Sequence, residues 1–147
     1  MRIEENRLSG EQIALLFDTA EQFRKRAYAP YSHFQVGAAL LTKEGRIYGG
    51  LNIENAAYSP TNCAERTAFC HAVSDGERNF AAIMILGGME NEKPQFCTPC
   101  GVCRQVMAEF CDPDTFVILS GTSPSDCRQF LLRELLPYGF TDQNLQK

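Results

Sequence analysis

Apolar residues recur at three- and four-residue steps over the first part of the chain, between Ile13 and Ala27. Such spacing places side chains on one face of a helix. The stripe consists of Ile13, Leu16, Phe17, Ala20, Phe23 and Ala27. Ser9 and Gln12 have the spacing of a capping box, so we expect the helix to begin there and to end at Pro30.

Continuous apolar runs farther along the chain predict strands. Residues 36–41 and 47–52 flank a polar turn at 43–46, and this arrangement is typical of a β-hairpin. Residues 81–86 predict a buried strand, and residues 115–119 predict another.

Two further helices are expected, one over residues 63–73 and one that begins at Pro99 and ends near residue 110. Residues 87–98 between them read as a loop. The stretch 127–136 is ambiguous, because its apolar residues fit a helix by period while its first half also fits a final strand. The order of these elements indicates an α/β protein, with a mixed sheet covered by helices on both faces.

Composition and charge narrow the class of protein. The chain has 147 residues, of which 44% are apolar, so we expect one domain over residues 1–147. A formal net charge of −4 disfavours a nucleic-acid partner, because phosphate backbones bind basic surfaces. Residues 1–6 lack a signal-peptide pattern, and no apolar run has the length of a membrane span. We therefore expect a cytoplasmic protein that does not contact a membrane.

Seven cysteines in a reducing compartment argue against a disulfide framework and leave metal ligation, catalysis or burial. Cys100 and Cys103 are three residues apart at the start of a predicted helix, so their thiols share one face. Cys63 lies at the start of another predicted helix. If the three thiolates converge, they leave a tetrahedral zinc ion one open position for water, as in catalytic zinc sites.

Glu65 lies two residues after Cys63, where its carboxylate can face the site without binding the metal. A carboxylate in that place can accept and return the proton of the water. Three Cys or His ligands, a non-ligating Glu and a Pro-Cys-x-x-Cys segment together characterise zinc-dependent nucleobase deaminases. Zinc with three thiolates carries a net negative formal charge. We therefore expect Arg66 or Arg104 to donate hydrogen bonds to the sulfurs.

Four segments stand out by their order and spacing. They are Asn52-Ile53-Glu54-Asn55, Cys63-Ala64-Glu65-Arg66-Thr67-Ala68, Pro99-Cys100-Gly101-Val102-Cys103-Arg104-Gln105 and Glu134-Leu135-Leu136-Pro137. Together they resemble the small, homotetrameric cytidine deaminases, and the similarity extends from about Tyr28 to Phe140. The resemblance implies a three-layer α/β/α fold with a mixed sheet of about five strands, one zinc ion per chain, and a homotetramer with shared active sites.

The resemblance also implies an activity, the hydrolysis of cytidine or 2′-deoxycytidine to the uridine product and ammonia in pyrimidine salvage. It assigns zinc ligation to Cys63, Cys100 and Cys103, and proton transfer to Glu65. The nucleoside would be contacted by Phe34, Asn52, Glu54, Ala56, Tyr58, Ala64, Thr98 and Phe140.

Within that set the implied roles differ. Asn52 and Glu54 would bind the ribose 3′-hydroxyl, and the main-chain carbonyl of Thr98 would accept a hydrogen bond from the substrate amine. The family usually has Ser at the position of Thr98, and a main-chain role survives that change. Tyr58 and Ala56 would extend to a neighbouring subunit, and Phe140 would reach a neighbour's pyrimidine.

The short connection at residues 120–126 bears on the substrate class. Seven residues are too few for a crossover helix, so a strand that begins at Cys127 has to pair antiparallel with the preceding strand. The resemblance implies that polynucleotide-editing relatives differ here, because their pattern has a helix inserted at this connection. The connection and the acidic charge therefore favour a free nucleoside over a nucleic acid.

Several residues have alternative interpretations. Cys97, Cys100 and Cys103 form a C-x-x-C-x-x-C run, so Cys97 is an alternative ligand, and Cys100 with Cys103 alone would fit a redox dithiol. We expect the remaining cysteines to be small buried residues; they are Cys70, Cys111 and Cys127. Of the two histidines, His71 is expected in a core or interface, and His33 has no assigned role.

Three rival functions remain open. The first is a deaminase of a modified cytosine nucleoside, of the blasticidin type. The second is a non-catalytic zinc module, for which Cys97 is the one candidate fourth ligand. The third is a polynucleotide-editing enzyme.

Overall fold

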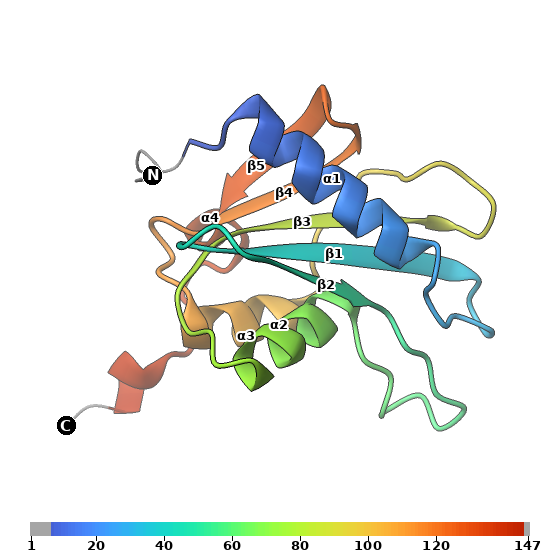
Figure 1. Cartoon of the computed structure of the whole chain (residues 1–147). Helices are drawn as coiled ribbons and strands as arrows, with labels where there is room; N and C mark the ends of the chain where they lie inside the picture. Colours follow the sequence, from blue (N-terminus) through green and yellow to red (C-terminus); the bar gives the residue numbers. More distant parts are fainter. Residues whose placement is uncertain (1–6, 146–147) are drawn as a thin grey trace.

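A computed structural model describes residues 7–145 as one mixed five-stranded sheet with helices on both faces (Figure 1). The strand order is β2-β1-β3-β4-β5. The strands are β1 (Phe34–Thr42), β2 (Ile47–Leu51), β3 (Phe80–Met89), β4 (Val117–Ser123) and β5 (Asp126–Leu131). The helices are α1 (Gly10–Arg24), α2 (Ala64–Ser74), α3 (Gly101–Phe110), α4 (Leu132–Leu135) and a terminal 3-10 turn, η1 (Asp142–Leu145). The α/β class and the mixed sheet of five strands are confirmed.

The direction of each strand follows from its connection. The short turn between β1 and β2 makes an antiparallel hairpin, and β1 also pairs antiparallel with β3. The crossover through α3 makes β3 and β4 parallel. After the tight turn at Pro124 and Ser125, β5 returns antiparallel to β4. The ambiguous stretch 127–136 is thus a strand followed by the short helix α4, and the expected antiparallel pairing is confirmed.

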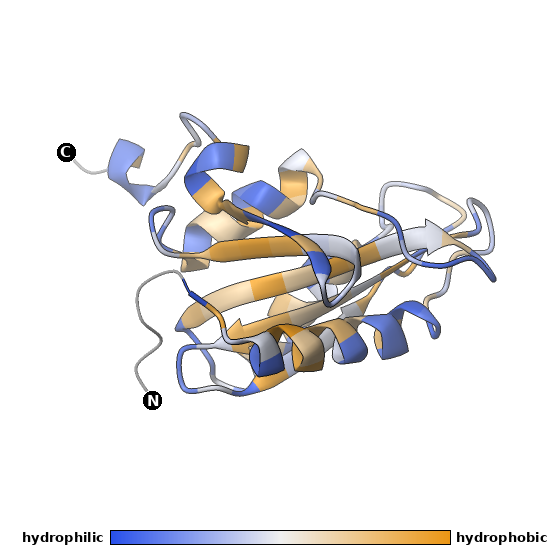
Figure 2. Ribbon diagram, turned by 90° about the horizontal axis from the view of Figure 1, so that it is seen from above, coloured by the Kyte–Doolittle hydropathy of each residue, from blue (hydrophilic) through white to orange (hydrophobic). Residues whose placement is uncertain are grey.

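Successive side chains of the central strands point to opposite faces of the sheet and belong to two separate hydrophobic cores. In β3, Ile83 and Ile85 point to the side of α2 and α3, while Met84 and Leu86 point to the side of α1. Figure 2 shows apolar residues concentrated on the strands and polar residues on the outward parts of α1. The two faces therefore have separate cores, and the cysteine-bearing segments belong to the face of α2 and α3.

Glycine allows α1 and α2 to approach the sheet closely. A Cβ at Gly37 of β1 would lie 1.9 Å from the carbonyl oxygen of Ala20 in α1. A Cβ at Gly50 of β2 would lie 2.2 Å from the carbonyl oxygen of Ala64 in α2. Any larger residue at Gly50 would push away the end of α2 that carries Cys63.

The element boundaries differ from the sequence-based expectations at α1, β3 and β4, and β4 runs over Val117–Ser123 where residues 115–119 were expected. Helix α1 begins with the Ser9–Gln12 capping box but ends at Arg24, well before Pro30. Strand β3 continues to Met89, into the predicted loop 87–98, because Phe34 at the start of β1 still pairs with it. The pattern at residues 1–6 lies outside the described residues. Across residues 7–145, none of the helices combines the length and apolarity that a membrane span requires.

Candidate active site

Two helix N-termini bring three thiols together. Cys63 is the N-cap of α2, Cys100 is the N-cap of α3, and Cys103 lies in the first turn of α3. The three Sγ atoms lie within 4.8 Å of one another, and 3.8 Å separates those of Cys63 and Cys100. The main-chain N–H of Cys103 donates to the Cys100 sulfur over 3.4 Å. Helix N-termini favour negative charge, so both helices stabilise thiolates at this place.

The donor set fits a zinc ion. Three sulfurs at this mutual distance provide the soft ligands that zinc binds in a tetrahedron with one position left open. The thiols of Cys63 and Cys103 share a hydrogen bond, which lowers the pKa of Cys63 to about 5 and raises the pKa of Cys103. One thiol of this pair thus ionises readily. A bound dication favours ionisation of the second as well.

Arg66 provides the positive charge beside the thiols. Its Nη2 donates to the Cys63 sulfur over 3.5 Å, and its Nε is buried without a hydrogen-bond partner among the described residues. The hydrogen bonds to Cys63 and Cys103 raise the pKa of the guanidinium, so it stays charged. Arg66 therefore occupies the place at which the sequence predicts compensation of the thiolate charge.

Arg104 has different partners. Its Nε donates to the Pro99 carbonyl over 2.7 Å, its Nη1 to the Leu135 carbonyl over 2.7 Å, and its Nη2 to Thr98 Oγ1 over 3.4 Å. The structure directs this guanidinium to oxygen atoms of the segment before α3 and of α4, and not to a sulfur. Arg104 thereby joins the metal-binding segment to the C-terminal part of the fold.

Glu65 lies in the first turn of α2, next to Ala64, with 4% of its surface exposed. Burial, opposed by a main-chain hydrogen bond, raises the pKa of its carboxyl group to about 7. A group with that pKa can both accept and donate a proton at neutral pH. Its backbone position, two residues from Cys63, keeps it near the thiols without making it part of the cluster.

Cys97 is not among the three clustered thiols of the described residues. Its side chain is half-buried, and burial raises the pKa of its thiol to about 11. Its main-chain N–H donates to Ser120 Oγ over 2.9 Å. The alternative with Cys97 as a fourth ligand therefore receives no support from this geometry.

The other cysteines and the histidines lie outside the cluster. Cys111 is buried and Cys127 is half-buried, but Cys70 is exposed, so the expectation of burial is wrong for Cys70. Cys70 lies on the solvent-exposed side of α2. The buried side of this helix is formed by Ala64, Glu65, Ala68, Phe69 and Ala72. Nδ1 of His33 lies 3.3 Å from a carboxylate oxygen of Glu90, and Nδ1 of the exposed His71 lies 3.3 Å from the Gly49 carbonyl oxygen.

Asn52 and Glu54, the two residues predicted to bind ribose, form side-chain hydrogen bonds to nearby main-chain groups. The Asn52 amide accepts from the N–H of Val36 (2.8 Å) and donates to the carbonyl of Phe34 (2.9 Å), and so extends the β1–β2 pairing. Glu54 Oε1 accepts the N–H groups of Tyr31 (2.9 Å) and Ser32 (3.1 Å), and hydrogen bonds from Ser32 lower the pKa of this carboxyl.

The remaining substrate-contact candidates separate into two groups. Phe34 and Thr98 are half-buried and Ala64 is fully buried. A Cβ at Gly87 of β3 would lie 2.9 Å both from the Phe34 ring and from Cys97 Sγ, so these two side chains meet over that glycine. By contrast, Ala56 is exposed, as are Tyr58 (73%) and Phe140 (60%).

The family of the chain follows from comparison with known proteins. A family profile described as the cytidine and deoxycytidylate deaminase zinc-binding region matches residues 11–119. The chain belongs to this family. A cytidine deaminase of Halalkalibacterium halodurans is 49% identical over 131 residues, which are 89% of this chain and 96% of the relative. A cytidine deaminase of Sporosarcina psychrophila is 48% identical, over 90% of this chain and 94% of the relative.

A solved structure agrees with the family membership. The crystal structure of cytidine deaminase from Burkholderia pseudomallei superposes with a TM-score of 0.76 at 42% identity, over 86% of this chain and 97% of that one. The chain therefore has the cytidine deaminase fold. Its five-stranded mixed sheet and its cysteine cluster both agree with the zinc-binding region of the family.

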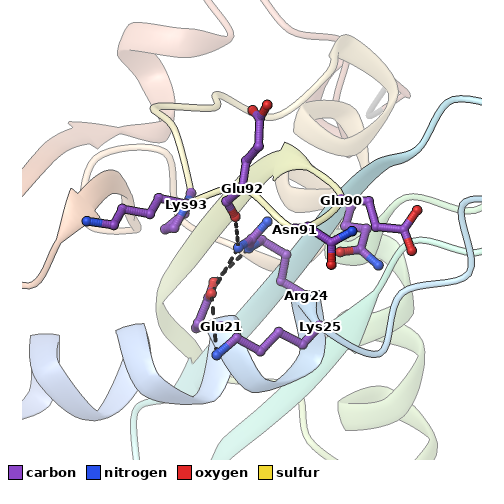
Figure 3. Close-up of a pocket in the computed structure, with 9 residues that line it drawn as sticks. Glu21, Arg24, Lys25, Glu90, Asn91, Glu92 and Lys93 are labelled. Carbon is purple, nitrogen blue, oxygen red and sulfur yellow. Dashed lines mark hydrogen bonds and ion pairs between the residues drawn. The ribbon is translucent and has the colours of Figure 1, made fainter.

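A surface cavity of about 490 Å³ lies on the other side of the sheet, between α1 and the loop after β3 (Figure 3). Arg24 binds both carboxylate oxygens of Glu21 (2.6 and 2.9 Å) and the Glu92 carbonyl (2.8 Å). Three acidic and three basic residues line the cavity, namely Glu21, Glu90, Glu92, Arg24, Lys25 and Lys93. The ion pairs of Glu21 with Arg24 and Lys25 stay within α1 and its C-cap, and the hydrogen bond from Arg24 to the Glu92 carbonyl joins the helix to the loop.

Ser120 is the site-face residue that motif spacing missed. Its hydroxyl is buried on β4 and holds the N–H of Cys97, three residues before Cys100. A sequence signal did exist: Ser120 is a polar residue two positions after Ile118, on the inward-pointing register of a buried strand.

Proposed function

We propose that this chain is a zinc-dependent deaminase that hydrolyses cytidine and 2′-deoxycytidine to uridine and 2′-deoxyuridine, with release of ammonia. The observation that carries the proposal is the buried carboxyl of Glu65 beside the three clustered thiols at two helix N-termini. Similarity to curated cytidine deaminases over nearly the whole chain supports the substrate class. Residues 1–147 would act as one deaminase domain.

The proposed metal ligands are Cys63, Cys100 and Cys103. Zinc bound there would supply an acidified water at its open position. Arg66 would offset the negative charge of the thiolates, an assignment supported by its contact with the Cys63 sulfur.

Glu65 is the proposed proton carrier. It accepts one proton from the attacking water and passes it to N3 of the pyrimidine while the hydroxyl oxygen bonds to C4. It then takes the second proton of that oxygen to the departing nitrogen, the C4–N bond breaks, and ammonia leaves. The raised pKa of Glu65, about 7, supports both directions of transfer.

The nucleoside would be held by Phe34, Asn52, Glu54, Ala64 and the main-chain carbonyl of Thr98. For the ribose end, support comes from the rigid placement of Asn52 and Glu54, since each makes two hydrogen bonds to main chain. For the amine, support comes from the position of Thr98 directly before Pro99 and the ligand Cys100.

We further infer a homotetramer in which Ala56, Tyr58 and Phe140 complete the active site of a neighbouring chain. The exposure of all three residues in the isolated chain is consistent with such a contact. Pyrimidine salvage in the cytoplasm would be the setting.

The proposal is tested by the ultraviolet absorbance change of cytidine and 2′-deoxycytidine with the purified protein, a zinc assay and the Glu65→Gln variant. We expect turnover by the native chain, and a loss on the order of 10²- to 10⁴-fold in the variant at unchanged zinc content. Zinc-loaded native protein that leaves both nucleosides unchanged would refute the proposal. Conversion of a blasticidin-type nucleoside or of an oligonucleotide instead would then identify the correct rival.

A further inference from the structure

Ser120 is a buried polar side chain for which the proposed mechanism has no role. Its residue is 1% exposed, on β4 between Ile85 of β3 and Arg128 of β5. In β4, Ile118 joins the core on the side of α2 and α3, and the strand alternation gives Ser120 the same side. The hydroxyl thus projects toward the segment that leads to the cysteine cluster.

The hydrogen bond from Ser120 anchors an otherwise weakly held segment. Ser120 Oγ accepts the main-chain N–H of Cys97 over 2.9 Å. Residues 97–99 belong to none of the strands, and Pro99 has no N–H of its own. A side-chain hydroxyl therefore supplies here what a neighbouring strand supplies elsewhere.

The other end of the segment is also held by a side chain. Arg104 donates to the Pro99 carbonyl over 2.7 Å and to Thr98 Oγ1 over 3.4 Å. The ring of Pro99 restricts the backbone of Thr98 to extended conformations. With Ser120 at one end and Arg104 at the other, few rotations remain between Cys97 and the Thr98 carbonyl.

We propose that Ser120 is a positioning residue for the deamination: its hydroxyl holds the N–H of Cys97 and thereby sets the position of the Thr98 carbonyl toward the substrate amine. This inference rests on the proposed function. Without the hydroxyl, the N–H of the half-buried Cys97 loses its acceptor, and the segment has to move to find another. A displaced carbonyl would no longer meet the amine in the reactive complex.

The test compares Ser120→Thr with Ser120→Val, because these two side chains have the same shape and differ in the hydroxyl. Both carry the same added methyl group, so any crowding is common to the pair. We expect kcat/KM for cytidine to be on the order of 10- to 100-fold lower in Ser120→Val than in Ser120→Thr. The zinc content should be equal.

Uridine separates a positioning effect from a general structural one. It has a carbonyl at C4 in place of the amine, so it cannot donate to Thr98. We expect its competitive inhibition constant to be the same in the two variants. If both variants fail to fold, Ser120→Ala against the native chain replaces them, with the same expected split between cytidine turnover and uridine inhibition.

Thr42 provides a matched control at the far end of the sheet. Its buried Oγ1 accepts the N–H of Arg46 over 3.0 Å, the same type of bond in the β1–β2 turn. Thr42→Val should lower the melting temperature but leave kcat/KM unchanged.

The outcomes distinguish this inference from the proposed function. If the native chain does not deaminate cytidine, the proposed function fails first. If it does, equal kcat/KM in Ser120→Thr and Ser120→Val overturns the inference. A loss that uridine binding shares, or that Thr42→Val reproduces, overturns it as well.

Discussion

The Nη2 atom of Arg66 lies 3.5 Å from the sulfur of Cys63, while the Nε atom of the same guanidinium is buried without a partner in residues 7–145. A buried donor without an acceptor is costly, so this placement has to be stabilised by the charge nearby. Three thiolates around a zinc dication leave excess negative charge, which one guanidinium neutralises. We therefore expect zinc affinity to depend on Arg66.

Replacement of Arg66 by Gln should therefore weaken zinc binding by about 10- to 100-fold. The measurement is a competition titration with a chromogenic chelator at pH 7. Arg104→Gln is the control, because the hydrogen bonds of Arg104 go to the Pro99 and Leu135 carbonyls. It should lower stability and weaken zinc binding less than Arg66→Gln does, because Arg104 holds the segment before Cys100 without contacting a sulfur. An equal fall in zinc affinity for both variants would assign the effect to packing instead of charge.

The contribution of Tyr48 to the stability of the fold depends on pH in the alkaline range. Its hydroxyl donates to Asp75 and, over 3.2 Å, to Glu77, and these carboxylates together with partial burial raise its pKa from 10.0 to about 12. The folded chain thus retains this proton where the unfolded chain loses it. The stability that Tyr48 contributes is fully present below pH 10, and it falls between pH 10 and about 12.

The measurement is urea unfolding of the native chain and of Tyr48→Phe at several pH values. The native chain should be the more stable of the two at pH 8, and this advantage should shrink above pH 10. Tyr138→Phe, at a fully exposed position, should match the native chain at pH 8. A stability difference between native and Tyr48→Phe that stays constant up to pH 12 would rule out the hydroxyl as its source.

Sequence patterns predicted most of this fold, because hydrophobic periodicity and helix capping depend on residues that are close in the sequence. The capping box at Ser9 and the alternation of the strands describe α1 and the sheet well. The positions of Cys63 and Cys100 at helix starts were also predicted, whereas their convergence was only a possibility, because helix starts alone do not bring two helices together. Strand β3, however, extends beyond its apolar run, because pairing with β1 holds Gly87 and Gly88, which have no hydrophobic signal of their own.

Side-chain partners were less predictable than elements. Position next to a ligand suggested the same role for Arg66 and Arg104, yet only the three-dimensional arrangement shows that Arg104 reaches α4. The role of Ser120 cannot be predicted from spacing, because its partner, the N–H of Cys97, lies 23 residues away and belongs to the main chain. Contacts of that kind leave no spacing in the sequence.

Arg24 should stabilise the fold without affecting the chemistry. It is 3% exposed and binds Glu21 with two hydrogen bonds on the α1 face of the sheet. Arg24→Met removes the main partner of Glu21, and we expect a loss of about 3 kcal/mol, since Glu21 keeps some contact with water.

Lys25 is the control for Arg24. It contacts the same carboxylate at 3.9 Å but is 70% exposed, so Lys25→Met should cost less than about 1 kcal/mol. Denaturant unfolding gives both values. Cytidine turnover at 25 °C should be unchanged in both variants, and a reduced turnover in Arg24→Met at full folding would connect this network to the active site.

Gly50 controls the distance between β2 and the helix that carries Cys63 and Glu65. A Cβ at this position would lie 2.2 Å from the Ala64 carbonyl oxygen and 2.4 Å from the Ala68 nitrogen, both main-chain atoms of α2. Since main chain cannot rotate away, Gly50→Ala has to displace the helix. We expect a destabilisation of about 3 kcal/mol or more, together with weaker zinc binding, because Cys63 moves with α2.

The matched substitution is Gly10→Ala at the start of α1, where nothing lies within 4 Å of the added methyl group. It should stabilise the chain by about 0.5 kcal/mol, since alanine loses less backbone entropy in a helix. Urea unfolding and zinc content of the two variants test the difference. If Gly50→Ala were as stable as the native chain and bound zinc equally well, the contact between β2 and α2 would not be what places Cys63.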